Sequence, residues 1–134
     1  MSEHLTHCDE DGKAIMVDVG DKLQPRRVAL VRGEIRMQGE TLRRILDRTV
    51  EKGDVFSVAR LAGIMAAKQT SSLIPLCHPL GLSSVEVNFT PDLQQGKVDI
   101  EACAKLTGQT GVEMEALTAV SIAALTIYDM SKAV

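Results

Sequence analysis

Four charged side chains stand at the two ends of a long apolar segment, residues 107–132. Glu113 and Glu115 lie near its start, and Asp129 and Lys132 lie at its end. The residues between them are almost all apolar, and a helix that is apolar on every side is a buried helix. A charge that lies beside protein instead of bulk water needs a partner or takes part in chemistry. The pattern therefore marks these four residues as candidates for acid–base catalysis.

The two glutamates have different alternatives. Thr110 and Glu113 have the spacing of a capping box, in which Glu113 bonds to a free backbone N–H at the start of the helix. This structural role explains Glu113 without any chemistry. Glu115 lies about 200° further round the helix, between Met114 and Ala116. A carboxylate in apolar company tends to have a raised pKa and can act as an acid or a base, so Glu115 is harder to explain structurally.

Asp129 and Lys132 are close enough along the helix for a surface ion pair, which is the alternative to a catalytic role. About 21 Å of helix separates Glu115 from Asp129. One small-molecule site cannot easily hold both ends of that helix. If both ends serve catalysis, a neighbouring subunit must supply one of them, and the site lies at a subunit interface.

A histidine stands in a stiff, non-helical stretch, residues 73–80 (LIPLCHPL). Pro79 disfavours helical geometry for His78, and Pro75 stiffens the approach. A histidine held in this way is a candidate for ligand binding or proton transfer. A structural histidine that caps backbone groups fits the pattern equally well. Cys77 beside it fits a small core residue better than a nucleophile.

Two further charged residues are candidates for the site. Lys52 precedes Asp54, a good N-cap for a following helix, and a lysine near a helix N-terminus can bind phosphate. An exposed, solubilising lysine is the alternative. Asp18 lies inside an apolar tetrad, residues 16–19 (MVDV), where it can cap a turn or face a site.

The composition limits the classes of partner. The chain has 134 residues, a net charge of −3, two Phe, one Tyr and no Trp, which argues against a nucleic-acid binder. We see neither a secretion leader nor an apolar run that could span a membrane. Three cysteines without a CxxC pair suit the cytoplasm. His4, His7 and Cys8 lack a fourth ligand, so we expect no metal site.

Apolar and polar residues alternate with a period of two in three segments, which predicts half-buried antiparallel strands at 28–37, 84–90 and 97–106. Helical patterns occupy about 40–48, 54–68 and 107–132. The order of strand, helices, strand, strand and helix is most of a βαββαβ plait, an α+β fold with helices on one face of an antiparallel sheet.

We expect residues 1–14 to form a flexible tail and residues 15–134 to form a single catalytic domain. The final strand of the plait is not in the sequence, so either further residues or another chain would cover the sheet edge. The helices also carry more apolar surface than one face of a small sheet can cover. This surplus predicts oligomerisation through helix faces.

Several segments together resemble the MoaC family of molybdenum-cofactor biosynthesis proteins: MVDV, KGDVF, LIPLCHPL and TGVEMEALTA. The resemblance covers about Leu5 to Val134. It implies a lyase that converts 3′,8-cyclo-7,8-dihydroguanosine 5′-triphosphate into cyclic pyranopterin monophosphate and pyrophosphate. It also implies a ferredoxin-like fold and a homo-hexamer of three dimers, with active sites at the dimer interface.

The resemblance assigns roles to individual residues. The family's two essential lysines fall on Lys52 and Lys132. Its other active-site residues fall on Asp18, His78, Glu113, Glu115 and Asp129, and its substrate contacts on Leu76, Cys77, His78, Met114 and Glu115. We further expect Asp129 and Lys132 to exchange protons as a pair, and Lys52 and His78 to stabilise charge as the cyclic phosphate closes.

Family members continue beyond the position of Val134 through a further strand, so the fourth strand and some basic contacts are expected to lie outside this sequence. The sequence requires no cofactor, although Mg²⁺ is compatible with a triphosphate. Two other functions fit the same fold: a ligand-binding module and a scaffold for other enzymes of the pathway. An assay that detects pyrophosphate release from the cyclised nucleotide would exclude the ligand-binding module. A scaffold should tolerate the loss of Glu115 and Asp129.

Overall fold

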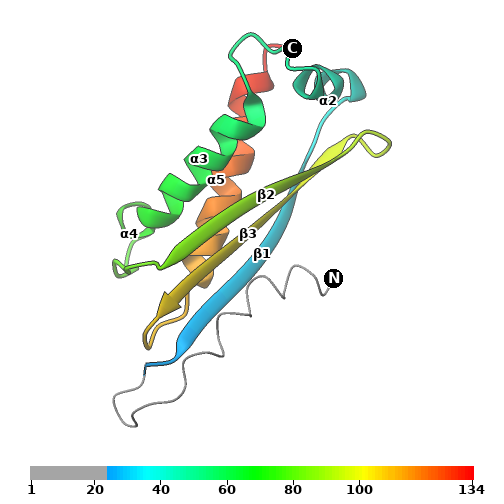
Figure 1. The fold of residues 1–134 in the computed structure, drawn as a ribbon. Helices are drawn as coiled ribbons and strands as arrows, with labels where there is room; N and C mark the ends of the chain where they lie inside the picture. Colours follow the sequence, from blue (N-terminus) through cyan, green and yellow to red (C-terminus); the bar gives the residue numbers. More distant parts are fainter. Residues whose placement is uncertain (1–23) are drawn as a thin grey trace.

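The structure, a computed structural model, describes residues 24–134. Three strands form one antiparallel sheet, and two long helices cover one of its faces (Figure 1). The predicted α+β architecture is therefore confirmed. The predicted flexible segment 1–14, the start of the domain at residue 15 and the candidate residue Asp18 lie outside the described residues.

Strand β3 (Lys97–Thr107) lies between β1 (Arg26–Arg36) and β2 (Ser84–Asp92) and is antiparallel to both. All three strands predicted from the alternation are present, with their ends shifted slightly. The order β1-β3-β2 is the order of the first three strands of a ferredoxin-like plait. In such a plait a fourth strand would lie beside β1, which is an edge strand among residues 24–134.

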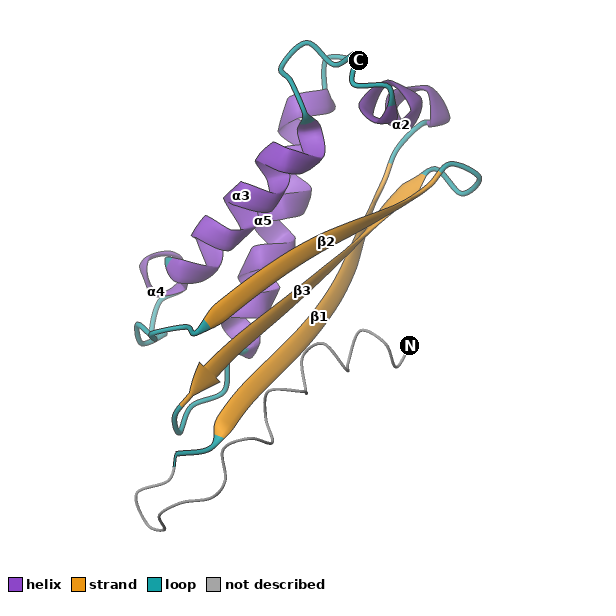
Figure 2. Cartoon of the chain, viewed as in Figure 1, coloured by secondary structure: helices purple, strands orange, loops and turns teal. Residues whose placement is uncertain are grey.

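The described part of the chain contains four helices: α2 (Gly39–Leu46), α3 (Val55–Lys68), α4 (Thr70–Leu73) and α5 (Glu113–Ser131). Helices α3 and α5 pack side by side on the sheet, and α2 lies near the end of the molecule where α3 begins and the chain terminates (Figures 1 and 2). The one-turn helix α4 was not predicted. Within residues 24–134, no helix is long and apolar enough to cross a membrane.

The start of α5 differs from the prediction. Val112 is the N-cap, no side chain caps the helix there, and Glu113 is the first helical residue. The capping box between Thr110 and Glu113 is therefore wrong. Gly108 and Gly111 favour a loop at this point, and the loop turns the chain from β3 onto the helix layer.

The core lies between the sheet and the two long helices. Alternate residues of β3 are fully buried against one side of α5: Val98, Ile100 and Ala102 from the strand, and Ala119, Ala123 and Ile127 from the helix. Small residues also bring α3 close to α5, because a Cβ atom at Gly63 would lie only 3.0 Å from the Ala119 carbonyl oxygen. This close packing fixes where the ends of the two helices lie relative to each other.

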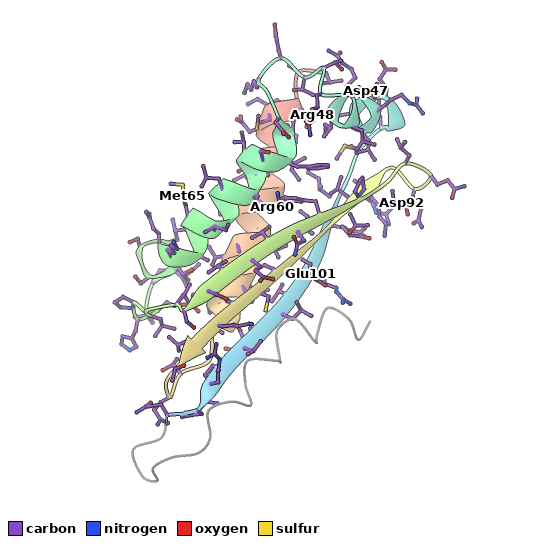
Figure 3. The ribbon with its side chains drawn as sticks, viewed as in Figure 1. Asp47, Arg48, Arg60, Met65, Asp92 and Glu101 are labelled. Carbon is purple, nitrogen blue, oxygen red and sulfur yellow. The ribbon has the colours of Figure 1, made fainter. Side chains whose placement is uncertain are left out.

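The sequence predicted that helix α5 is buried on every side. In a single chain it is not. Leu125 and Tyr128 are 59% and 58% exposed. On α3, Leu61 and Met65 are also exposed, and Met65 projects away from the sheet (Figure 3). The surplus apolar surface predicted from the sequence is therefore present on both helices.

Candidate active site

Lys52, Asp129 and Lys132 meet at the C-terminal end of α5. The Nζ atom of Lys52 lies 3.4 Å from Asp129 Oδ2 and donates a hydrogen bond of 3.2 Å to the Asp129 backbone oxygen. The Nζ atom of Lys132 lies 3.2 Å from Oδ1 of the same carboxylate. Each lysine therefore holds a different oxygen of Asp129. The ion pair anticipated between Asp129 and Lys132 is present, with a second cation that is distant in sequence.

The loop before α3 brings Lys52 to this position. Asp54 caps α3 by accepting hydrogen bonds from the Ser57 backbone N–H at 3.3 Å and from the Ser57 hydroxyl at 2.9 Å. This confirms the N-cap predicted from the sequence. Gly53 has a φ of 114°, a conformation that favours glycine. The cap and the glycine turn together direct the chain so that Lys52 reaches α5.

The two ammonium groups lower the pKa of the Asp129 carboxyl. The hydrogen bond from Lys132 contributes most, followed by the one from Lys52. Asp129 is therefore a carboxylate at neutral pH, where it accepts hydrogen bonds and has no proton to donate. The predicted proton exchange between Asp129 and Lys132 stays a prediction. Because all three side chains are about half exposed, water screens the pairs, and they orient the lysines more than they stabilise the fold.

A shallow hollow of about 440 Å³ adjoins this group. Its lining consists of Leu125, Thr126, Tyr128, Asp129 and Lys132. Its volume is within the range of ligand pockets, about 300–1,000 Å³. Its lining combines apolar and aromatic side chains with a carboxylate and an ammonium group, which suits a ligand with a ring system and phosphate groups.

Glu115 is buried at the opposite end of α5. Its exposed fraction is 3%, and within residues 24–134 no hydrogen bond or ion pair reaches its carboxylate. The predicted position of Glu115 among buried residues is confirmed, whereas Glu113 and Met114 are exposed. A carboxyl group with so little exposure and no partner among the described residues is unfavourable, and such groups are concentrated at functional sites.

The loop between α4 and β2 lies at this same end of the molecule. Ser84, where β2 begins, pairs with Lys105 near the end of β3, so the loop lies close to the connection between β3 and α5 (Figure 1). The loop carries His78, which is exposed, and Cys77, which is half-buried. His78 and Glu115 therefore lie at one end of the fold, as a shared site requires.

Leu76 in this loop has an unusual conformation that no sequence signal predicted. Its φ is 68°, in the left-handed region, and its side chain is 100% exposed. Both features are unfavourable for leucine in a single chain. Strained residues of this kind occur at ligand-binding positions, which is where the family resemblance places Leu76.

Within one chain, the predicted site residues form two groups instead of one. We call Lys52, Asp129 and Lys132 the lysine group, and Glu113, Glu115 and His78 the carboxylate–histidine group. Helix α5 separates the two groups by about 21 Å, as its length predicted. They lie at opposite ends of the helix layer (Figure 1). A single protomer therefore does not assemble the complete set of candidate residues.

Another hollow lies on the face of the sheet without helices. It has a volume of about 610 Å³, and none of the candidate site residues lines it. Its charged residues pair across the strands: Arg32 Nε donates to Glu101 Oε2 at 2.8 Å. Figure 3 shows Glu101 on this face. Among the described residues, no group of three or more His, Cys, Asp or Glu is placed to hold a metal ion.

The described residues form an α+β plait with lysines, a histidine and carboxylates at the two ends of its helix layer. Comparison with known sequences identifies the family. The sequence model of the MoaC family matches residues 16–134. The chain therefore belongs to the MoaC family.

Relatives of the chain include three proteins named cyclic pyranopterin monophosphate synthase. The one from Pelotomaculum thermopropionicum is 62% identical over 130 residues, which cover 97% of this chain and 76% of the relative. The one from Chloroflexus aurantiacus is 63% identical over 130 residues, with 97% and 80% covered. The one from Thermoanaerobacter sp. is 56% identical over 131 residues, with 98% and 83% covered.

Proposed function

We propose that this chain converts 3′,8-cyclo-7,8-dihydroguanosine 5′-triphosphate into cyclic pyranopterin monophosphate, with release of pyrophosphate, in molybdenum cofactor biosynthesis. One observation carries the proposal: Lys52 and Lys132 converge on Asp129, although Lys52 and Asp129 lie 77 positions apart in the sequence. These are the two lysines that the family resemblance marks as essential. The names of the relatives support the same reaction.

The lysine group is suited to phosphate chemistry. Each ammonium group has three N–H donors, and the contacts with Asp129 leave donors on both lysines for phosphate oxygens. When a sugar hydroxyl attacks the α-phosphorus, negative charge accumulates on the departing pyrophosphate. Lysines that are already oriented stabilise that charge without reorganisation. We assign Asp129 the role of orienting both lysines, because its lowered pKa keeps it ionised.

The carboxylate–histidine group is suited to proton transfer. Conversion of a guanine-derived ring into a pyranopterin requires ring opening, ring closure and several proton transfers. We assign these steps to Glu113, Glu115 and His78, because carboxylates and imidazoles are the usual proton carriers of enzymes. Leu76 and Met114 are exposed apolar residues beside this group, and we assign them contacts with the rings of the substrate.

The two groups are too far apart in one chain to serve one substrate molecule. We infer that the lysine group of one protomer and the carboxylate–histidine group of a second protomer form each complete site. The exposed Leu125 and Tyr128 adjoin the lysine group and provide apolar surface for the second protomer. We propose the family's homo-hexamer of three dimers, located in the cytoplasm, with Mg²⁺ entering only as a companion of the triphosphate.

Mixing two inactive variants tests both the reaction and the composite site. Lys132→Ala removes a cation from the lysine group, and Glu115→Gln removes the charge from the carboxylate–histidine group. In a mixed dimer of these variants, one site receives both substitutions and the other receives neither. Equal mixing with free exchange of protomers should therefore restore pyrophosphate release to about a quarter of the wild-type rate.

The outcomes separate the competing explanations. Restored activity in the mixture, with each variant inactive alone, supports a lyase with composite sites. A mixture as inactive as its components, despite proven exchange of protomers, contradicts the composite site. Wild-type protein that binds the cyclised nucleotide without releasing pyrophosphate is a ligand-binding module, and the proposed reaction is then wrong.

A further inference from the structure

The carboxylate of Glu113 lies directly over Gly111, two residues before it in the chain. A Cβ atom built on Gly111 would lie 2.6 Å from both Oε1 and Oε2 of Glu113, and 2.9 Å from its Cδ atom. Because both oxygens are equally close, the carboxylate presents its two oxygens together to the glycine. The Glu113 side chain therefore folds back over the loop, although the residue is exposed.

The conformation of Gly111 does not itself require glycine. Among the described glycines only Gly53 and Gly96 have a positive φ, so the backbone at Gly111 is one that alanine can adopt. A side chain at this position would lack space, and the three atoms nearest to its Cβ atom all belong to Glu113. A methyl group at position 111 would therefore displace the carboxylate and leave the rest of the fold in place.

The folded-back carboxylate also has an electrostatic reason. Glu113 is the first residue of α5, and Val112 before it provides no side-chain cap. The backbone N–H groups at this helix end are therefore free of a capping side chain, and the helix dipole favours a negative charge near them. The absence of a side chain at Gly111 lets the carboxylate stay in this favourable region.

We propose that Gly111 is a positioning residue of the active site. Because it has no side chain, it leaves room for the Glu113 carboxylate at the position from which Glu113 transfers a proton. The catalytic part of this inference rests on the proposed function, in which Glu113 transfers a proton. A displacement of about 1 Å at a reacting group can lower the rate about a hundredfold. Gly111 then affects the chemical step while it contacts neither substrate nor product.

Gly111→Ala tests the inference, and Gly108→Ala is its matched control. A Cβ atom at Gly108 would lie 3.6 Å from the nearest atom, Leu106 Cδ2, which is an ordinary contact. Gly111→Ala should lower kcat for pyrophosphate release about ten- to a hundredfold, with little change in KM. The melting temperature should not fall, because alanine also restricts the unfolded chain. Gly108→Ala should keep the wild-type kcat.

A double variant separates positioning from any other role of Gly111. In a chain that already carries Glu113→Ala there is no carboxylate to displace, so adding Gly111→Ala should change kcat no further. A clear additional loss in the double variant would overturn the inference. So would a Gly111→Ala protein with the wild-type kcat.

A crystal structure of Gly111→Ala decides the geometry without any activity assay. A displaced Glu113 carboxylate supports the positioning role even if the proposed reaction proves wrong, and an unmoved carboxylate overturns it. The failure of the inference and the failure of the proposed function are therefore distinguishable.

Discussion

The two ends of α5 carry charged residues in opposite states. At the C-terminal end, Asp129 has two cationic partners, and all three side chains are about half exposed to water. At the N-terminal end, Glu115 is 97% buried, and no partner reaches it within the described residues. The charges at the C-terminal end are paired within residues 24–134, whereas the same residues supply no partner for Glu115 at the N-terminal end.

The two groups of site residues therefore contribute differently to the stability of the fold. The lysine group is weakly stabilising because water screens its ion pairs, and it forms on folding of one protomer. The carboxylate–histidine group is less favourable for folding, because Glu115 is only 3% exposed without a partner among the described residues and the backbone of Leu76 is strained. A substrate or a second protomer that pairs with Glu115 and covers Leu76 would relieve both costs.

The largest expected effect concerns the end whose charges are paired. Lys132→Ala should lower kcat about 10²–10³-fold, the usual loss when one oriented donor to a developing charge is removed. Because the ion pair is exposed, the melting temperature should change little. Steady-state pyrophosphate release and thermal unfolding measure the two quantities.

Arg43→Ala is the control: it removes an exposed cation of α2 that makes no contact with Asp129, and its activity should stay at the wild-type level. Wild-type turnover by Lys132→Ala would remove Lys132 from the mechanism.

The second prediction concerns the other end. Glu115→Leu should lower pyrophosphate release and raise the free energy of unfolding by about 1–3 kcal/mol, because an apolar side chain replaces a carboxyl group that is only 3% exposed and has no partner among the described residues. Chemical denaturation of the assembled protein measures this change. Glu113→Leu should give no such gain, since Glu113 is exposed at a helix start that favours its charge. A destabilised Glu115→Leu protein would mean that a neighbouring protomer pairs with Glu115, and the contrast between the two ends would then hold only for the isolated chain.

The smallest effects distinguish two residues with the same strained backbone. Arg48 has a φ of 59° and Leu76 a φ of 68°. Arg48 completes the end of α2, where its N–H donates to Ile45 O at 3.1 Å and the Thr49 N–H donates to Arg44 O at 3.0 Å. This is the Schellman arrangement, in which glycine is the usual residue. The label in Figure 3 places Arg48 beside α2, far from the loop that carries Leu76.

Replacement of each residue by glycine should therefore have the same effect on stability but a different effect on activity. Both Arg48→Gly and Leu76→Gly should be as stable as wild type or more stable by up to about 1 kcal/mol, because glycine adopts a positive φ without strain. Arg48→Gly should keep full activity. Leu76→Gly should lower kcat/KM about tenfold or more, through loss of an apolar contact with the substrate. Equal activity of the two variants would show that Leu76 is strained for a reason unrelated to substrate binding.

The sequence determined the elements that depend on local periodicity. The alternation of apolar residues located all three strands, and Asp54 located the start of α3, because side-chain direction and capping are local properties of the chain. The predicted capping box of α5 failed because the same spacing also occurs in a loop, and five residues of loop, 108–112, turn the chain from β3 onto the helix layer before Glu113.

The tertiary structure alone decided which candidate residues meet. The contact of Lys52 with Asp129 spans 77 positions and depends on the close packing of α3 on α5 at Gly63, which no local pattern reveals. The separation of Glu115 from Asp129 could be predicted, because a helix has a fixed rise per residue. The strain at Leu76 and the Glu113 carboxylate over Gly111 could not, because each depends on how a loop closes between elements that only the packed core holds in place.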